Sequence, residues 1–228
     1  MSIYKYLPQR YEDGFVKRGE VLFRALSYFH DLESADGRAD AYEGTRRFRP
    51  REGLEVNNIT SGQKFNLPES FSLESTAKTD DIFVFCTSTL LSEALAREFK
   101  AAICIEIVEE IKFISRLRDA LIRRPRVRPP KTLLHAPVNY YDSADPPIVD
   151  WALPDRIAMS KPIPFAYQLE YRFAFCVNDA FRVENTTQII TTQKRTANVR
   201  VTPYPQELLV LGSLRKLVRV HRFNRVVA

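Results

Sequence analysis

PFAYQLEYRFAF, residues 164–175, is the stretch that decides the fold class, because it alternates as a β-strand does. Its apolar side chains fall on one face of the predicted strand: Leu169, Tyr171, Phe173 and Phe175. Its polar side chains fall on the other face: Gln168, Glu170 and Arg172. A solvated face or a structural row of ion pairs explains such a pattern, and so does a cleft that holds a substrate.

Strands and helices do not alternate regularly outward from this stretch, which favours a mixed α+β fold with two β-layers and flanking helices. We predict strands at 3–6, 21–24, 80–86, 102–107 and 133–142, and a hairpin-like pair at 188–193 and 197–202. Residues 34–81 are predicted to form loops and weak hairpins. A turn of helix ends at Gly19, and another is expected around Asp155.

Two longer helices are predicted from apolar residues at helical spacing. The first covers 87–99, where Leu90, Leu91, Ala94, Leu95 and Phe99 recur behind a cluster of hydroxyl side chains. The second covers 108–124 and is ended by the prolines that follow. Its apolar face is predicted to comprise Ile111, Ile114, Leu117 and Leu121.

The chain has 228 residues, of which 45% are hydrophobic, so it can bury a core as one domain over 1–228. Its basic C-terminal segment, 206–228, is expected to pack on that domain or to be partly mobile. No apolar run has the length of a signal peptide or a membrane span, and we therefore predict a cytoplasmic protein without a membrane partner.

Cysteine and histidine spacing gives no indication of a metal site or a disulfide framework. We predict that Cys86, Cys104 and Cys176 are buried free thiols. The seven glycines form neither a dinucleotide-binding loop nor a phosphate-binding loop. The proline-rich connection before residue 164 contains Trp151 and Lys161, which are most simply anchors of a loop.

The formal charge of +6 is concentrated in two segments, Arg116–Lys131 and the stretch from Leu214 to Arg225. Such clustering is a possible footprint for a polyanion, and the alternative is a solvated helix end and tail. The candidate nucleic-acid contacts are Arg123, Arg124, Arg126 and Arg128.

Three short motifs stand in order along the chain: Tyr4-Lys5-Tyr6, Thr87-Ser88-Thr89 and Gln168-Leu169-Glu170. This trio resembles the signature of ADP-ribosyltransferases, which carry Arg or His on an early strand, an S-T-S motif on a middle strand and [QE]-x-E on a late one. Lys5 departs from that pattern. The chain also resembles an uncharacterised bacterial family with Y-K-Y, C-x-S and E-Y-R motifs. This second resemblance supports a prediction of the shape of the protein more than one of its function.

The first resemblance implies NAD as substrate, no metal, and a role for each motif. Glu170 would stabilise the oxocarbenium-like charge that forms when the nicotinamide leaves, and Gln168 would align the incoming nucleophile. Ser88 would orient Glu170, while Thr87 and Thr89 would cap the next helix or line the pocket. The remaining candidates are Lys5 and Arg24 for the pyrophosphate, Tyr4 or Tyr6 for stacking, and Arg172, paired with Glu170 or an acid such as Asp31.

We therefore predict an NAD-dependent ADP-ribosyltransferase that modifies a macromolecule, nucleic acid or acidic protein, as a bacterial toxin or phage-defence effector with a possible antitoxin or regulatory partner. The alternative is a non-catalytic binding module whose basic surfaces engage nucleic acid or an acidic partner. Glu170 separates the two, because only the enzyme needs its carboxylate. A nuclease is disfavoured, because no cluster of acids for Mg²⁺ stands out.

Overall fold

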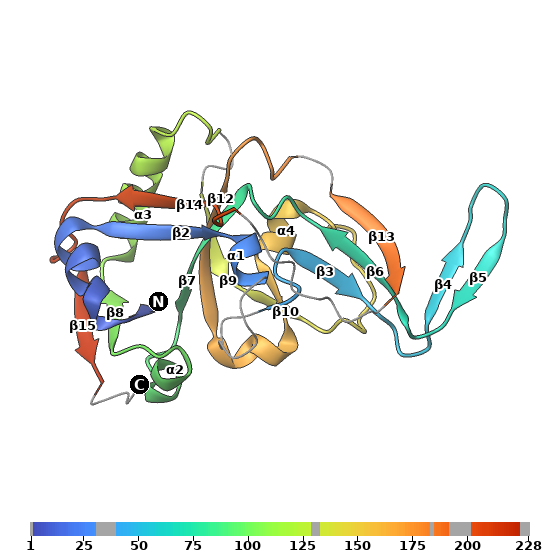
Figure 1. Cartoon of the computed structure of the whole chain (residues 1–228), viewed down its shortest axis with the longest axis horizontal. Coiled ribbons are helices and arrows are strands. Elements are labelled where there is room, and N and C mark those ends of the chain that lie inside the picture. The colour runs from blue at the N-terminus through green and yellow to red at the C-terminus, as the bar shows by residue number, and fades with distance from the viewer. Residues whose placement is uncertain (1, 31–39, 129–132, 183–184, 192–201, 224–228) are drawn as a thin grey trace.

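The structure is a computed structural model that describes residues 2–30, 40–128, 133–182, 185–191 and 202–223. It is a mixed α+β fold, as the sequence predicts, and most of its strands pair antiparallel. Figure 1 shows a large sheet at one end, a three-stranded sheet beyond it, and a two-stranded hairpin at the far end.

The large sheet contains eight strands: β1 (Ile3–Leu7), β2 (Glu20–Ala25), β7 (Ile82–Ser88), β8 (Ile103–Ile107), β9 (Leu134–Pro137), β12 (Glu170–Cys176), β14 (Gln206–Val210) and β15 (Val218–Arg222). The three-stranded sheet contains β3 (Thr45–Phe48), β6 (Phe71–Thr76) and β13 (Thr186–Thr191). The two-stranded pieces are the β4 (Leu54–Asn57)–β5 (Lys64–Leu67) hairpin and the parallel pair β10 (Asn139–Tyr141) and β11 (Ser160–Pro162).

The helices are few: α1 (Leu26–His30), α2 (Glu93–Glu98), α3 (Glu110–Ile122) and α4 (Pro154–Ala158). Short helical turns complete the fold: the 3₁₀ turns η1 (Gln9–Tyr11) and η3 (Ile163–Gln168) and the π-helical turn η2 (Gly14–Arg18). As predicted, η2 ends at Gly19, whose φ of 70° is left-handed and suits glycine. No helix among the described residues is long and apolar enough to cross a membrane.

Strand β7 is the centre of the large sheet, and the sheet forks along one of its edges. One edge pairs with β12 along its whole length, from Glu170 opposite Ser88 to Cys176 opposite Ile82. The other edge pairs with β2 only at Val84 and Phe83, and with β1 only at Ser88. Strands β1 and β2 therefore diverge between these points and leave an opening beside β7.

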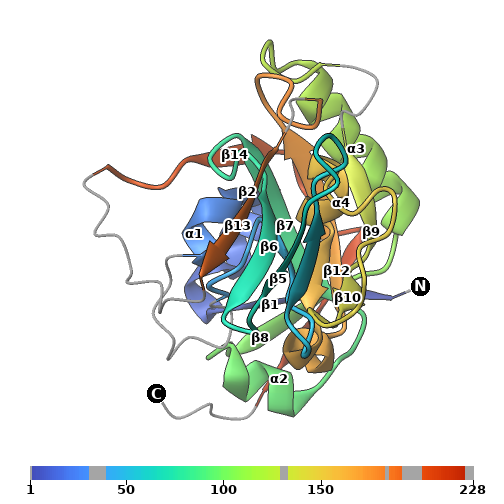
Figure 2. The same cartoon turned by 90° about the vertical axis from the view of Figure 1, so that its right-hand side faces the viewer.

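Strands β7 and β12 lie between two apolar cores, which Figure 2 shows with α3 on one side of the strands and α1 on the other. The first core joins Phe85, Phe173 and Phe175 to Phe113 and Leu117 of α3. The second core joins Val84 and Ala174 to Leu26 of α1 and Ile157 of α4. All seven residues of β12 are buried, so the strand that alternates in sequence has no solvated face.

Several local predictions are wrong because tertiary contacts override the pattern. The helix expected over 87–99 begins at Glu93, capped by Ser92, whose hydroxyl accepts from the N–H groups of Ala94 and Leu95. The exposed Leu90 and Leu91 precede it. In α3 the predicted core residue Ile111 is 84% exposed, and Phe113 is buried instead.

The strand expected at 133–142 is two strands in different sheets, β9 and β10, with Val138 between them. Strand β13 pairs with β6, and most of its predicted hairpin partner, 197–202, lies outside the described residues. The described part of 34–81 contains the predicted hairpin, β4–β5, and also β3 and β6 of the three-stranded sheet. The C-terminal segment joins the large sheet, because β14 pairs with β2 and β15 with β8.

Candidate functional site

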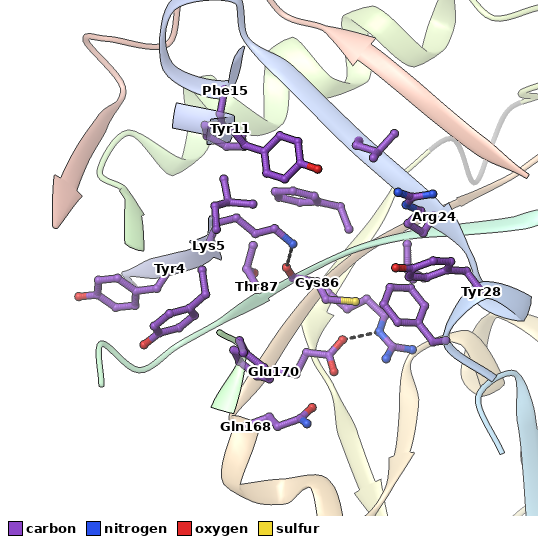
Figure 3. Close-up of a pocket in the computed structure, with 18 of the residues that line it drawn as sticks. Tyr4, Lys5, Tyr11, Phe15, Arg24, Tyr28, Cys86, Thr87, Gln168 and Glu170 are labelled. Carbon is purple, nitrogen blue, oxygen red and sulfur yellow. Dashed lines mark hydrogen bonds and ion pairs between the residues drawn. The ribbon is translucent and has the colours of Figure 1, made fainter. Parts of the chain in front are cut away.

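A cavity of about 430 Å³ occupies the opening between β1 and β2, a size typical of small-molecule sites. Eight of the ten predicted catalytic and cofactor-binding residues line it: Tyr4, Lys5, Tyr6, Arg24, Thr87, Gln168, Glu170 and Arg172. Figure 3 shows that they come from several elements that are far apart in sequence. Ser88 and Thr89 do not line the cavity.

Glu170 and Gln168 share the cavity, but not in the way the strand pattern predicted. Gln168 ends η3 instead of lying on β12, and Leu169 follows in the left-handed region with φ 42°. Leu169, predicted to lie on the apolar face, is exposed and belongs to neither core. Lys161 nevertheless brings the two polar side chains together: its Nζ donates to Oε1 of Gln168 at 3.0 Å and to Oε2 of Glu170 at 3.4 Å. The predicted pair is therefore held by a buried ammonium instead of by strand geometry.

Arg172 is the centre of a buried ion-pair network and is only 1% exposed. Its Nε donates to Oε1 of Glu170 at 2.8 Å. Its two terminal nitrogens bind Glu43 at 2.7 and 3.2 Å, and one of them also donates to the carbonyl of Ala158 at 2.6 Å. The paired acids are Glu170 and Glu43, while Asp31 lies outside the described residues. The network alternates in charge from Glu43 through Arg172 and Glu170 to Lys161, so each buried charge has a partner of opposite sign.

This network keeps the Glu170 carboxylate ionised. Burial raises the pKa of that carboxyl, but the charges of Arg172 and Lys161, with hydrogen bonds from Arg172 and Cys86, lower it to about 2. Burial also lowers the pKa of Lys161, yet Glu170 and Glu43 raise it overall. Asp40 lies in the same region, and burial together with the charge of Glu43 raises its pKa to about 6.

Lys161 corrects a sequence prediction. It is a buried residue of β11 rather than the anchor of a loop, and it pairs in register with Tyr140 of β10. Trp151, the other expected loop anchor, is buried as well. Glu43 was missed entirely. Neither position carries a local signal, because a lone Lys among prolines and a lone Glu before a strand are both common in loops.

The hydroxyl motif supports the backbone instead of the carboxylate. Ser88 donates to the carbonyl of Gln168 at 2.8 Å, and so fixes the turn before β12 rather than the Glu170 side chain. Thr87 donates to the carbonyl of Tyr171 at 2.6 Å and Thr89 to that of Leu169 at 3.2 Å. Neither threonine caps α2. All three hydroxyls hold η3 and β12 against β7.

Lys5 spans the opening of the sheet. Its Nζ donates to the carbonyl of Cys86 at 2.7 Å and lies 4.4 Å from the centre of the Phe85 ring (Figure 3). This carbonyl lies on the stretch of β7 where neither β1 nor β2 is paired, so the ammonium takes the place of a strand donor. Cys86 is partly exposed and lines the cavity, unlike the buried Cys104 and Cys176; all three thiols are free.

Two further arginines give the cavity its positive charge. Arg24 lies over the ring of Tyr28, 4.6 Å from its centre, and Arg10 lies over Tyr11 at 4.9 Å. Within the described part of the chain no acid forms an ion pair with either of them. Both arginines and both tyrosines line the cavity, so a cation beside an aromatic ring is available at two places.

Tyr6 and Tyr4, the predicted stacking residues, both make ring contacts within the fold. The Tyr6 hydroxyl donates to the carbonyl of Leu90 at 2.6 Å and accepts from the N–H of Ser92 at 2.7 Å. Its ring stacks on Phe223 and meets Phe99 edge-on. Tyr4 meets His221 edge-on. Tyr28 and Tyr11, which the sequence prediction missed, also line the cavity beside the cations, and Tyr28 in turn meets Phe29 and Tyr204 edge-on.

The predicted nucleic-acid residues lie at and after the C-terminal end of α3 and are exposed: Arg123, Arg124, Arg126 and Arg128. Arg124 and Arg126 face Glu207 at 4.0 and 3.8 Å, and Arg128 binds Asp179 at 3.2 Å. These surface pairs reduce the excess positive charge there. No group of three or more His, Cys, Asp or Glu that could hold a metal ion occurs among the described residues.

Comparisons with protein-family models, with curated proteins and with solved structures found no match for this chain.

Proposed function

We propose that the cavity binds NAD and that the protein is an ADP-ribosyltransferase acting on a macromolecule. The observation that carries the proposal is the convergence of eight predicted residues from β1, β2, β7, η3 and β12 on one cavity of suitable size. Motifs that agree only by chance have no reason to share a cavity. The ADP-ribosyltransferase-like shape belongs to the same proposal, supported by the fork in the sheet.

The cavity has the charges that NAD requires at its two chemically different parts. Arg24, Arg10 and Lys5 supply cations for the pyrophosphate, beside the rings of Tyr28 and Tyr11. Glu170 supplies an ionised carboxylate for the nicotinamide ribose. Cations and an ionised carboxylate in one cavity suit a ligand with an anionic centre and a reacting end.

In the proposed reaction the bond between C1′ of the ribose and the nicotinamide nitrogen breaks, and its electron pair leaves with nicotinamide. The positive charge that develops on the ribose is stabilised by Glu170. A nucleophile of the acceptor then bonds to C1′ and loses its proton to solvent. Gln168 aligns that nucleophile through a neutral hydrogen bond, because an amide cannot act as a strong base.

A second candidate, a binding module without catalysis, is favoured by the pairing of Glu170. Both of its carboxylate oxygens face cations, at 2.8 and 3.4 Å, and such a pair needs no ligand to be stable. In this alternative the network only holds β12, η3 and β11 together.

The test is nicotinamide release from NAD by the purified protein, with and without RNA, DNA or a protein extract as acceptor. We expect the wild-type chain to release nicotinamide and Glu170→Gln to be slower by about 10²–10³-fold. Glu43→Gln is the matched control, since it also breaks an ion pair of Arg172 but keeps the Glu170 carboxylate. Because the charge beside the ribose is kept, its rate of nicotinamide release should fall by less than about tenfold.

Both variants are assayed at a temperature where far-UV circular dichroism shows them folded. Equal losses in the two variants would assign Glu170 a structural role and support the binding module. Absence of nicotinamide release by the wild type, together with no rise of its melting temperature in millimolar NAD, would overturn the proposal.

A further inference from the structure

A second pocket, of about 210 Å³, lies between β3, β10 and the connection that leads to α4. It shares no lining residue with the main cavity. Its lining comes from Arg46, Asn139, Tyr140, Tyr141, Asp142, Asp145, Pro146, Ile148 and Trp151. The main site and its proposed chemistry make no use of this pocket.

Arg46 is the unusual residue of this pocket, because its charge is buried and forms no ion pair with any acid that the structure describes. It is only 8% exposed, and its guanidinium lies 4.9 Å from the centre of the Tyr141 ring. Its Nε is buried, and within the described chain no acceptor binds it. Burial lowers the pKa of this guanidinium, and the opposing effects of Tyr141 and Asp150 do not offset it.

The chain satisfies its other buried arginine. Arg172 has two carboxylates and a carbonyl around it. The neighbour of Arg46 on β3, Arg47, also has a buried Nε that no acceptor in the described chain binds. Glu74, however, lies 3.6 Å from that Nε, and Nη1 of Arg47 donates to the Tyr42 hydroxyl at 2.8 Å. A buried guanidinium without an acceptor destabilises the folded state. Because Arg46 lines a pocket, a ligand bound in that pocket can supply the missing acceptor.

The lining of the pocket suits a carboxylate better than a phosphate. Its buried part combines the guanidinium with the rings of Tyr141 and Trp151, whereas the exposed Asp142 and Asp145 lie at its rim. A guanidinium matches the planar geometry of a carboxylate. Two carboxylates at the rim repel a doubly charged phosphate and attract a cationic group.

We propose that this pocket binds a small zwitterionic amino carboxylate, with its carboxylate on Arg46 and its ammonium at Asp142 and Asp145. The pocket volume suits a ligand no larger than a free amino acid. Tyr140 of β10 lines this pocket and also contacts the main site, because its hydroxyl accepts from the N–H of Glu170 at 2.8 Å. The proposal does not depend on NAD binding.

Trp151 makes the test direct, because it is the single tryptophan of the chain and lines this pocket. The full chain is titrated with 5-aminopentanoate, pentanoate, pentylamine and inorganic phosphate, and binding is followed by Trp151 fluorescence and by calorimetry. We expect saturable binding of 5-aminopentanoate, weaker binding of pentanoate, and none of pentylamine or phosphate.

Arg46→Gln should weaken 5-aminopentanoate binding by about 10- to 100-fold, the usual effect of losing hydrogen bonds to a charged group. Its melting temperature should be unchanged or higher, because a buried unpaired charge is removed. The control is Arg156→Gln, at an exposed arginine paired with Asp150 outside the pocket lining, and it should bind normally.

Asp142→Asn should reduce the preference for 5-aminopentanoate over pentanoate. The proposal is overturned if none of the four probes binds, if phosphate binds best, or if Arg46→Gln keeps its affinity. A lower melting temperature of Arg46→Gln with unchanged affinity would assign Arg46 a structural contact with Tyr141. The ranking of the four probes on the wild type tests the ligand class even if that variant fails to fold.

Discussion

Replacement of Glu170 by Gln tests how strongly the buried network stabilises the fold. The side chain keeps its size but loses its charge, so Arg172 and Lys161 each lose an ionised partner. The free energy that separates a pKa of about 2 from the ordinary value of 4.5 is about 3 kcal/mol. We therefore expect Glu170→Gln to lower the free energy of unfolding by about 3 kcal/mol at pH 7.

The pH dependence of this loss has a definite sign. Because folding lowers the pKa of Glu170, its contribution is fully present above the unfolded pKa of about 4.5. It decreases as the pH falls and is absent below the folded pKa of about 2. The difference in stability between wild type and variant should therefore shrink between about pH 5 and pH 2.

The assay is urea denaturation followed by the fluorescence of Trp151, repeated at pH 7, pH 4.5 and pH 3.5, with circular dichroism to check that unfolding is two-state. The control is Glu93→Gln, whose exposed pair with Arg97 on α2 should contribute less than about 0.5 kcal/mol. A Glu170→Gln variant as stable as wild type at pH 7, or a difference that does not change with pH, would refute the ion-pair reasoning.

Two other predictions follow from the surface charge and from the backbone. RNA or DNA binding should weaken at least about tenfold between roughly 50 and 200 mM salt. Alanine substitution of the exposed arginines should flatten that dependence without changing NAD binding: Arg123, Arg124, Arg126 and Arg128. Electrophoretic mobility shifts measure this, and no binding at low salt would remove nucleic acid as a partner. Gly19→Ala should destabilise the fold by about 2 kcal/mol more than Gly62→Ala in thermal melts. Equal effects of the two substitutions would show that a backbone clash at Gly19 does not decide its stability. Both glycines have φ of +70°, but only a Cβ at Gly19 would meet a backbone atom, the carbonyl oxygen of Gly212, at 2.0 Å.

The sequence by itself determines the features that depend on local periodicity. The alternation over 170–176 correctly separates Tyr171, Phe173 and Phe175 from Arg172, because adjacent residues of a strand must point to opposite faces. Glycine 19 marks a turn for an equally local reason, its left-handed φ. The positions of β2, β7, β8 and α3 follow from similar patterns.

Local patterns fail where a residue takes part in a contact that neighbours in sequence do not specify. Gln168 continues the alternation of β12, yet the chain turns at Leu169 because Ser88 at the end of β7 and Thr89 directly after it donate to the carbonyls of this turn. Ile111 has helical spacing, yet it faces solvent because the face of α3 that meets Phe85 and Phe173 is centred on Phe113.

Only the tertiary structure decides what the polar row of β12 faces. Arg172 binds Glu43 from 129 positions away in the sequence, and Lys161 reaches Glu170 from a separate parallel pair of strands. The opening between β1 and β2 exists because both strands share one edge of β7, and no local pattern records which edges pair. Sequence periodicity fixes the direction of a side chain relative to its own strand, whereas its partners, its burial and its charge state depend on residues that only the folded chain brings near.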